Sequence, residues 1–143
     1  MTTYSSSSGK KRVYRALFPE YFHYRGLYRL MGQLLRLQHE DPKFNFEVVV
    51  VTNSDIFITN IKKTINFCGG SHSSVRFVED TLDNFLLMVD KNSNKFDYIE
   101  FNGGLNLRSA YRSILSSLGN MLSPSGVIGL TAYMSNRMVD EIR

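Results

Sequence analysis

Four consecutive valines stand at positions 48–51, inside the segment FEVVVVT. A strand with one solvent-exposed face alternates apolar and polar residues, whereas a strand covered on both faces is apolar throughout. β-branched residues also favour extended structure. The segment 46–52 is therefore predicted to be a strand buried on both sides, as in a parallel sheet, and helices must cover that sheet.

Helical and extended patterns alternate along the rest of the chain. Apolar residues at steps of three and four predict helices at 19–39, 55–68, 81–90 and 108–122, and apolar or alternating runs predict strands at 73–79, 96–102 and 127–133. This alternation predicts an α/β fold with an open, mostly parallel sheet and flanking helices. Residues 1–18 are predicted to be a disordered basic tail, and residues 19–143 a single domain.

The composition excludes several classes of protein. No apolar run approaches the roughly 20 residues that cross a bilayer, so no membrane association is expected. The single cysteine, Cys68, cannot form an internal disulfide, which favours an intracellular, cytoplasmic protein. His23, His39 and His72 are scattered and make no metal-ligand pattern, so no metal is expected.

The positive charge is concentrated near the N-terminus. Residues 1–43 hold eight lysines and arginines against three acidic residues, although the net charge of the whole chain is only +4. Such an arm can contact nucleic acid or an acidic partner, or it can be a solvated extension without a role.

Small or polar residues follow the predicted strands. They are Thr52-Asn53, Glu79-Asp80-Thr81 and Asn102-Gly103-Gly104. Ligands of open α/β sheets bind outside the carboxyl ends of the strands, and glycine lets a backbone approach a ligand closely. Each position also has a simpler explanation, since Asp80 can cap the following helix and Gly103-Gly104 can form a turn.

Three segments together resemble the Rossmann-like, class I S-adenosylmethionine-dependent methyltransferases. They are VRFVEDTLDNF, FDYIEFNGGLNL and the helix that leads into LSPSGVIGLTAY. The resemblance implies S-adenosylmethionine as cofactor, with Asp80 accepting from the adenine amino group and the Thr81 N–H donating to the ring. It also implies that Asn102, Gly103 and Gly104 lie near the sulfonium and its methyl group.

The resemblance leaves out the family's first strand and its Gly-x-Gly loop. VVVVTNSD resembles the second strand, and Thr52 or Asn53 stands where the family has an acidic residue that holds the ribose hydroxyls; of the two, Asn53 could still hydrogen-bond a hydroxyl. The helix at 19–39 resembles the helix before the first strand. A partial domain is therefore expected, with a protein partner completing the sheet.

Three functions follow from these observations. The first is methyl transfer to an unknown acceptor, which needs alignment more than catalytic side chains; Tyr98 and Tyr133 could line the acceptor pocket, although strand aromatics are usually core. The second is an inactive methyltransferase-like interaction module. The third is an RNA-binding module, because IFITNI at 56–61 resembles a short motif of RNA-recognition domains and the N-terminal arm is rich in tyrosine and arginine.

Overall fold

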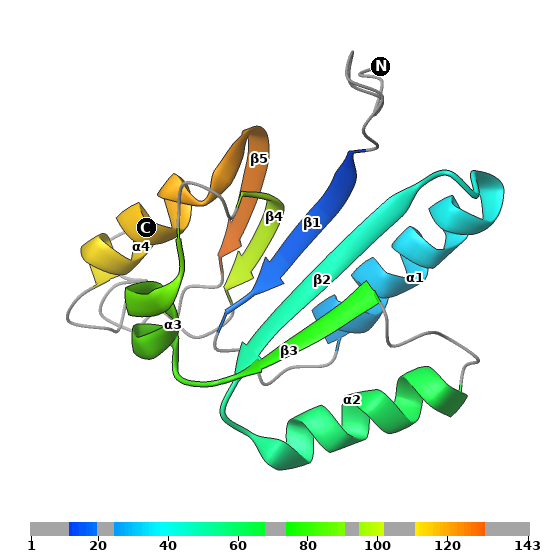
Figure 1. Ribbon diagram of the computed structural model, residues 1–143, viewed down its shortest axis with the longest axis horizontal. Helices are drawn as coiled ribbons and strands as arrows, with labels where there is room; N and C mark the ends of the chain where they lie inside the picture. Colours follow the sequence, from blue (N-terminus) through cyan, green and yellow to red (C-terminus); the bar gives the residue numbers. More distant parts are fainter. Residues whose placement is uncertain (1–11, 20–24, 68–73, 91–94, 102–110, 131–143) are drawn as a thin grey trace, which may run out of the picture.

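A five-stranded sheet with helices on both faces makes up the described part of the chain (Figure 1). The computed structural model describes residues 12–19, 25–67, 74–90, 95–101 and 111–130. The strands are β1 (Val13–Phe18), β2 (Asn45–Thr52), β3 (Val75–Glu79), β4 (Phe96–Phe101) and β5 (Leu122–Leu130). The helices are α1 (Arg25–Glu40), α2 (Asp55–Phe67), α3 (Leu82–Met88) and α4 (Tyr111–Asn120).

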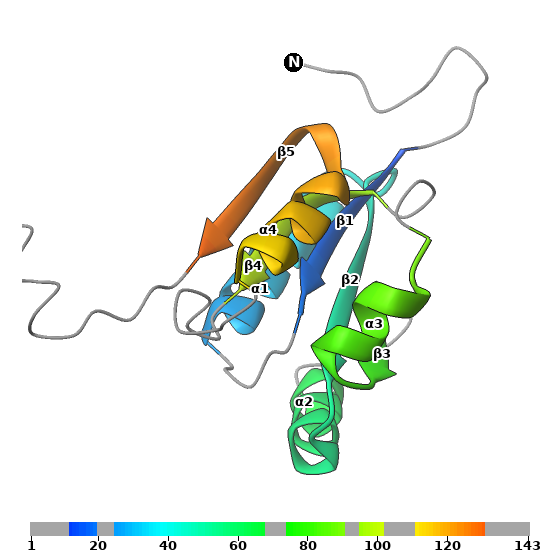
Figure 2. The same ribbon diagram turned by 90° about the vertical axis from the view of Figure 1, so that its left-hand side faces the viewer.

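The strands lie in the order β3-β2-β1-β4-β5, and every neighbouring pair is parallel (Figure 2). This confirms the predicted α/β fold with an open parallel sheet and flanking helices. The four valines of β2 are fully buried, as a strand covered on both faces requires.

β1 corrects the predicted tail. Residues 13–18 were assigned to a disordered arm, but they form the middle strand of the sheet, paired with β2 on one side and β4 on the other. Its last three residues, Ala16, Leu17 and Phe18, are fully buried. The sheet therefore has its central strand, and the prediction that the first strand is missing is wrong.

α1 also has a different place from the one predicted. It follows β1 and leads directly into β2, so β1, α1 and β2 form one parallel βαβ unit. The prediction of a helix preceding the first strand, and of a segment skipped before β2, is therefore wrong. What remains unusual is the connection between β1 and α1, which has no glycine between Pro19 and Arg25.

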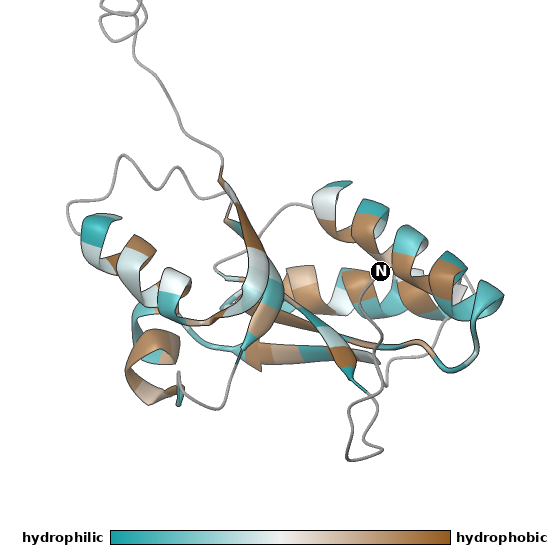
Figure 3. Cartoon of the chain, turned by 90° about the horizontal axis from the view of Figure 1, so that it is seen from above, coloured by the Kyte–Doolittle hydropathy of each residue, from teal (hydrophilic) through white to brown (hydrophobic). Residues whose placement is uncertain are grey.

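The core has two layers, one on each face of the sheet. The first joins β1 and β2 to α1 and α2 through Phe18, Val50, Leu27 and Ile61 among others. The second joins β1, β2 and β4 to α3 and α4 and includes Leu17, Leu82, Ile99 and Leu118. In Figure 3 brown and teal residues alternate along the helices, as expected when each helix buries one face.

β5 begins earlier than the sequence predicts. The segment Ser123–Gly126 was expected to separate the helix predicted at 108–122 from a strand at 127–133. Instead, β5 starts at Leu122 and includes this segment. Phe96 pairs with Leu122 and Tyr98 pairs with Val127, so the intervening residues of β5 form an irregularity opposite Asp97. A side chain at Gly126 would come within 2.9 Å of the Phe96 carbonyl oxygen, which explains the glycine there.

Two arginines, Arg15 of β1 and Arg12 directly before it, connect the central strands near their amino ends. The Arg15 guanidinium donates to Oε1 of Glu47 on β2 at 2.8 and 3.0 Å and lies over the ring of Phe96 on β4. Arg12 forms an ion pair with Asp97 on β4. The basic residues that made this segment resemble a tail therefore hold it within the sheet.

No helix in the described part of the chain is long and apolar enough to cross a membrane.

Candidate functional site

The carboxyl edge of the sheet contains a point where the strand order reverses. From β1 the chain goes to β2 and β3 on one side, and then crosses to β4 and β5 on the other side. In open α/β sheets this arrangement leaves a crevice beyond the ends of the strands, and ligands bind in it. Here the strand order reverses at the carboxyl ends of β1 and β4, and the neighbouring ends of β2 and β3 extend the same edge.

Asn53 lies at this edge, directly after β2, and is exposed. The preceding Thr52 is fully buried, and its Oγ1 accepts from the Ser54 N–H at 3.2 Å. Ser54 in turn caps α2, because its Oγ accepts from the Phe57 N–H. These bonds fix the turn while the Asn53 side chain faces solvent, where an amide can meet a ligand hydroxyl.

Asp80 and Thr81 lie at the end of β3, next to the end of β2. The Asp80 N–H donates to the Thr52 carbonyl oxygen at 3.2 Å, which joins the two strand ends. The structure therefore brings Asn53, Asp80 and Thr81 to one edge, as the sequence implied.

The hydrogen bonds around Asp80 settle how the following helix begins. Thr81 is the N-cap of α3, and its side chain accepts from the Asn84 N–H. Asp80 supports this cap rather than forming it, since its Oδ1 accepts from the Thr81 N–H at 2.7 Å and from Nδ2 of Asn84 at 3.0 Å. The Thr81 N–H that was assigned to the adenine ring is therefore bonded to Asp80 in this structure.

The third group of predicted residues lies outside the described part of the chain. β4 ends at Phe101, and Asn102, Gly103 and Gly104 follow it immediately. Their position after β4 rests on the sequence alone.

A carboxylate pair at the same edge was not singled out by the sequence. Glu79 ends β3 and Asp55 begins α2. A side-chain hydrogen bond with Asp55, and the charge of Asp55, raise the pKa of Glu79 above its usual 4.5, while Lys62 opposes the shift. The two carboxyl groups therefore share a proton more readily than isolated ones do.

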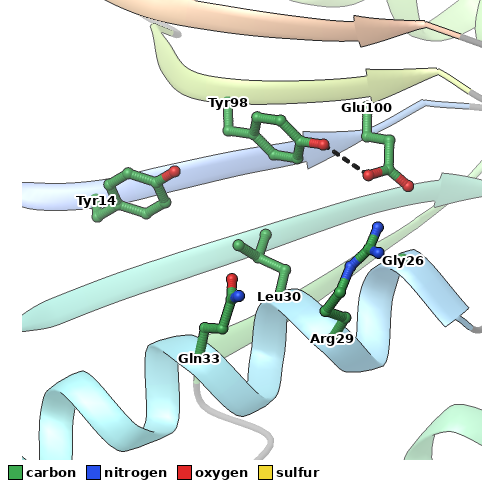
Figure 4. Close-up of a pocket in the computed structure, with 7 residues that line it drawn as sticks. All are labelled: Tyr14, Gly26, Arg29, Leu30, Gln33, Tyr98 and Glu100. Carbon is green, nitrogen blue, oxygen red and sulfur yellow. Dashed lines mark hydrogen bonds between the residues drawn. The ribbon is translucent and has the colours of Figure 1, made fainter.

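A cavity of about 300 Å³ lies between α1 and the face of β1 and β4 (Figure 4). It is lined by Tyr14, Gly26, Arg29, Leu30, Gln33, Tyr98 and Glu100. Tyr98 was one of two aromatic residues considered for an acceptor pocket, and it does line a cavity; the other, Tyr133, lies outside the described residues. No sequence pattern indicated the cavity as a whole, because its wall combines three separate elements.

Tyr98 and Glu100 form the polar side of this cavity. The Tyr98 hydroxyl donates to Oε1 of Glu100 at 2.6 Å, and Glu100 is only 8% exposed. Burial, this hydrogen bond and the charge of Glu100 raise the pKa of Tyr98, whereas Arg29 acts in the opposite direction. The phenol is therefore held as a neutral donor.

Two other expectations bear on the site. Within the described residues, no group of three or more histidine, cysteine, aspartate or glutamate side chains could hold a metal ion. The segment 56–61, which resembled an RNA-recognition motif, is part of helix α2. RNA-recognition domains display that motif on a strand, so this segment does not support RNA binding.

The strand order, the all-parallel pairing and the helices on both faces define a Rossmann-like fold of the methyltransferase type. Solved structures confirm this. PKMT2 from Rickettsia typhi, in complex with AdoHcy, matches with a TM-score of 0.54 and 23% identity over 82% of this chain and 20% of its own. A SAM-dependent methyltransferase from Geobacter sulfurreducens, in complex with S-adenosyl-L-homocysteine, matches with a TM-score of 0.53 and 16% identity over 82% of this chain and 41% of its own.

A putative sarcosine dimethylglycine methyltransferase from Galdieria sulphuraria matches over 91% of this chain and 44% of its own, with 13% identity and a TM-score of 0.57. The chain thus has the fold of class I S-adenosylmethionine-dependent methyltransferases but spans only about a fifth to two fifths of these proteins. No protein-family model and no curated protein sequence matches it.

Proposed function

We propose that this chain binds S-adenosylmethionine at the carboxyl edge of its sheet and transfers the methyl group to an acceptor. The reversal of strand order at β1 supports this most directly, because open α/β sheets bind ligands beyond the strand ends at such a reversal, here the ends of β1 and β4. The fold likeness supports the choice of ligand, since two of the matched proteins were solved with the demethylated cofactor.

The proposal gives each edge residue a role. Asp80 accepts from the adenine amino group, Asn53 bonds the ribose hydroxyls, and Asn102, Gly103 and Gly104 lie near the sulfonium. Adenine can receive the Thr81 N–H only if Asp80 releases it, because these two groups are 2.7 Å apart in a hydrogen bond. Methyl transfer then depends on aligning the acceptor with the methyl carbon, since the sulfonium is already activated.

Calorimetry with S-adenosylhomocysteine tests the proposal. Saturable binding is expected, and Asp80→Ala should weaken it about 10- to 100-fold, as expected for a lost charge-assisted hydrogen bond. Asp83→Ala is the matched control, because Asp83 is an exposed carboxylate in the first turn of α3 and is not one of the proposed contacts. No heat at about 1 mM ligand, with a normally folded protein, would refute cofactor binding.

One observation favours a second candidate, an inactive interaction module. The connection from β1 to α1 has no glycine between Pro19 and Arg25, although in the family a glycine loop meets the cofactor there. Among the described residues β5 lies at the edge of the sheet, and its nine residues include no charged side chain. A partner strand could pair with such an edge. Light scattering with the partner-free protein separates the two candidates if cofactor binding fails, since a module of this kind should self-associate or precipitate.

A further inference from the structure

The exposed side of α1 carries a row of arginines, Arg25, Arg29 and Arg36, which we call the arginine row. Their spacing places them within about 40° of one another around the helix, in a row about 16 Å long. All three are exposed, on the far side of the helix from the buried Leu27 and Leu34. The row is therefore a free surface of the described part of the chain.

Little negative charge balances this row. α1 has no acidic residue before its last position, Glu40, and within the described residues none of the three arginines forms an ion pair. α1 and α2 cover the same face of the sheet and together carry five lysines and arginines against two acidic residues. α3 and α4, on the opposite face, carry one of each. The charge of the helices is thus concentrated on one face, which suits an anionic partner.

Gly32 lies within the arginine row, three residues after Arg29 and four before Arg36. Glycine disfavours a helix more than any residue except proline. Even so, a Cβ at Gly32 would meet nothing within 4 Å among the described residues, so packing inside the protein does not require glycine there. The missing side chain leaves a gap between the arginines, where the backbone of a partner can approach the helix closely.

The surroundings of the row favour nucleic acid over a membrane surface. A helix that lies in a bilayer surface needs a free apolar face beside its basic face. The apolar face of α1 is already buried against the sheet, through Leu27, Met31 and Leu34. A guanidinium binds phosphate through two parallel hydrogen bonds, and a nucleic-acid strand carries one phosphate charge per nucleotide. The row is long enough to meet several phosphates of one strand.

The arginine row begins close to the edge where the cofactor is proposed to bind. α1 connects two parallel strands and runs back between them, so Arg25, its first residue, lies toward their carboxyl ends and Arg36 toward their amino ends. A strand bound along the row can therefore reach the carboxyl edge. A base in a duplex must first leave the stack, whereas an unpaired base can enter a site directly.

We propose that the methyl acceptor is a single-stranded nucleic acid, whose phosphates bind Arg25, Arg29 and Arg36. This inference rests on the proposed methyl-transfer function, although the strand itself binds without the cofactor. In the transfer, a lone pair of an acceptor nitrogen or oxygen forms the new bond to the methyl carbon. The electrons of the broken C–S bond return to sulfur, which becomes a neutral thioether, and the acceptor's proton passes to water.

Fluorescence anisotropy with single-stranded RNA and DNA of about 20 nucleotides and mixed sequence measures strand binding by the full chain. At least one of the two should bind with a Kd of about 1 to 100 µM at physiological salt. The logarithm of the binding constant should fall with that of the salt concentration with a slope of about −2, as expected for three phosphates of a single strand. Arg25→Gln combined with Arg36→Gln should weaken binding at least about tenfold and bring the slope to about −0.7.

Two controls separate the arginine row from general charge effects. Arg112→Gln removes an exposed arginine of α4, on the opposite face, and should leave binding within about twofold. Gly32→Glu adds a carboxylate inside the row, where a side chain has room, and should weaken binding at least about tenfold. Ser116→Glu adds the same charge at an exposed position of α4 and should change binding by less than about twofold.

Transfer of labelled methyl groups from S-adenosylmethionine to the bound strand tests the acceptor itself, and labelled strand is expected. Unlabelled strand, from a protein that binds both the strand and S-adenosylhomocysteine, would overturn the inference. So would no strand binding at about 100 µM, tighter binding of a duplex, or equal binding of a polyglutamate peptide, which would assign the row to an acidic protein. Strand binding without S-adenosylhomocysteine binding would support the nucleic-acid surface and refute the methyl-transfer function, so the two failures are distinguishable.

Discussion

Removing the Tyr98 hydroxyl tests whether its hydrogen bond to the buried Glu100 carboxylate of β4 stabilises the fold. Glu100 is 8% exposed and accepts from Tyr98 at 2.6 Å. Hydrogen bonds to charged groups contribute about 1.5 to 3 kcal/mol, and Tyr98 is only partly buried, so Tyr98→Phe should lower the free energy of unfolding by about 1.5 kcal/mol. For a chain of this length that corresponds to a fall in Tm of roughly 3 to 6 °C.

Urea unfolding followed by circular dichroism measures the change, and a second background isolates its cause. In Glu100→Gln the acceptor is neutral, so the same Tyr98→Phe change should cost about 1 kcal/mol or less. Tyr111→Phe is the matched control, because within the described residues the Tyr111 hydroxyl accepts an exposed bond from Arg112. Its effect should stay within about 0.5 kcal/mol.

The pH dependence of stability follows from the raised pKa of Tyr98. In the unfolded chain tyrosine ionises near pH 10, before the folded-state group does, so stability should fall as the pH rises above 10. Tyr98→Phe should reduce that fall. If Tyr98→Phe unfolds like the unaltered protein at neutral pH, within about 0.5 kcal/mol, the reasoning about Glu100 is wrong.

Three further changes test other parts of the structure. Carbon-detected NMR titration should place the pKa of Glu79 above 4.5, so the contribution of Glu79 to stability should decline as the pH rises past 4.5. Asp55→Asn should lower the pKa of Glu79. An unchanged titration midpoint in that variant would contradict the pairing of Glu79 with Asp55. Thr81→Ala should cost about 1 kcal/mol in urea unfolding through loss of the α3 cap. Arg15→Ala should cost about 1 to 2 kcal/mol, more than Glu47→Gln, because it also loses the contact with the β4 ring; equal costs would argue against that contact.

The sequence predicted the elements whose residues are uniform in character. The valines of β2 indicated a doubly covered strand, and the apolar spacing of α1 indicated a helix. β1 was missed because VYRALF carries an arginine and a tyrosine directly after a basic, serine-rich segment. Its pattern makes sense only once Glu47 of β2 and Phe96 of β4 are beside Arg15, and no local signal reveals such distant partners.

The place of three candidate residues at the carboxyl edge of the sheet could be predicted from the sequence, but their hydrogen bonds could not. Polar residues after apolar runs correctly located Asn53, Asp80 and Thr81 at one edge, because parallel strands end together. The hydrogen bond from the Thr81 N–H to Asp80 depends on the dihedral angles of one turn, which residue types do not determine. The cavity beside Glu100 was not foreseen, since a helix and two strands contribute to it.

The central place of β1 has a consequence for how the protein is made. Arg15 leaves the ribosome before Asp97 of the adjoining strand, which is 82 residues further along the chain. At a synthesis rate of about 5 to 20 residues per second, roughly 4 to 16 s pass between the synthesis of Arg15 and that of Asp97. Until then β1 to β3 can assemble only half a sheet, with one side of β1 open to pairing with other chains. Nascent chains that stop before residue 101 should therefore be especially prone to aggregate. Chaperone binding to the unpaired side of β1 should matter most in this interval.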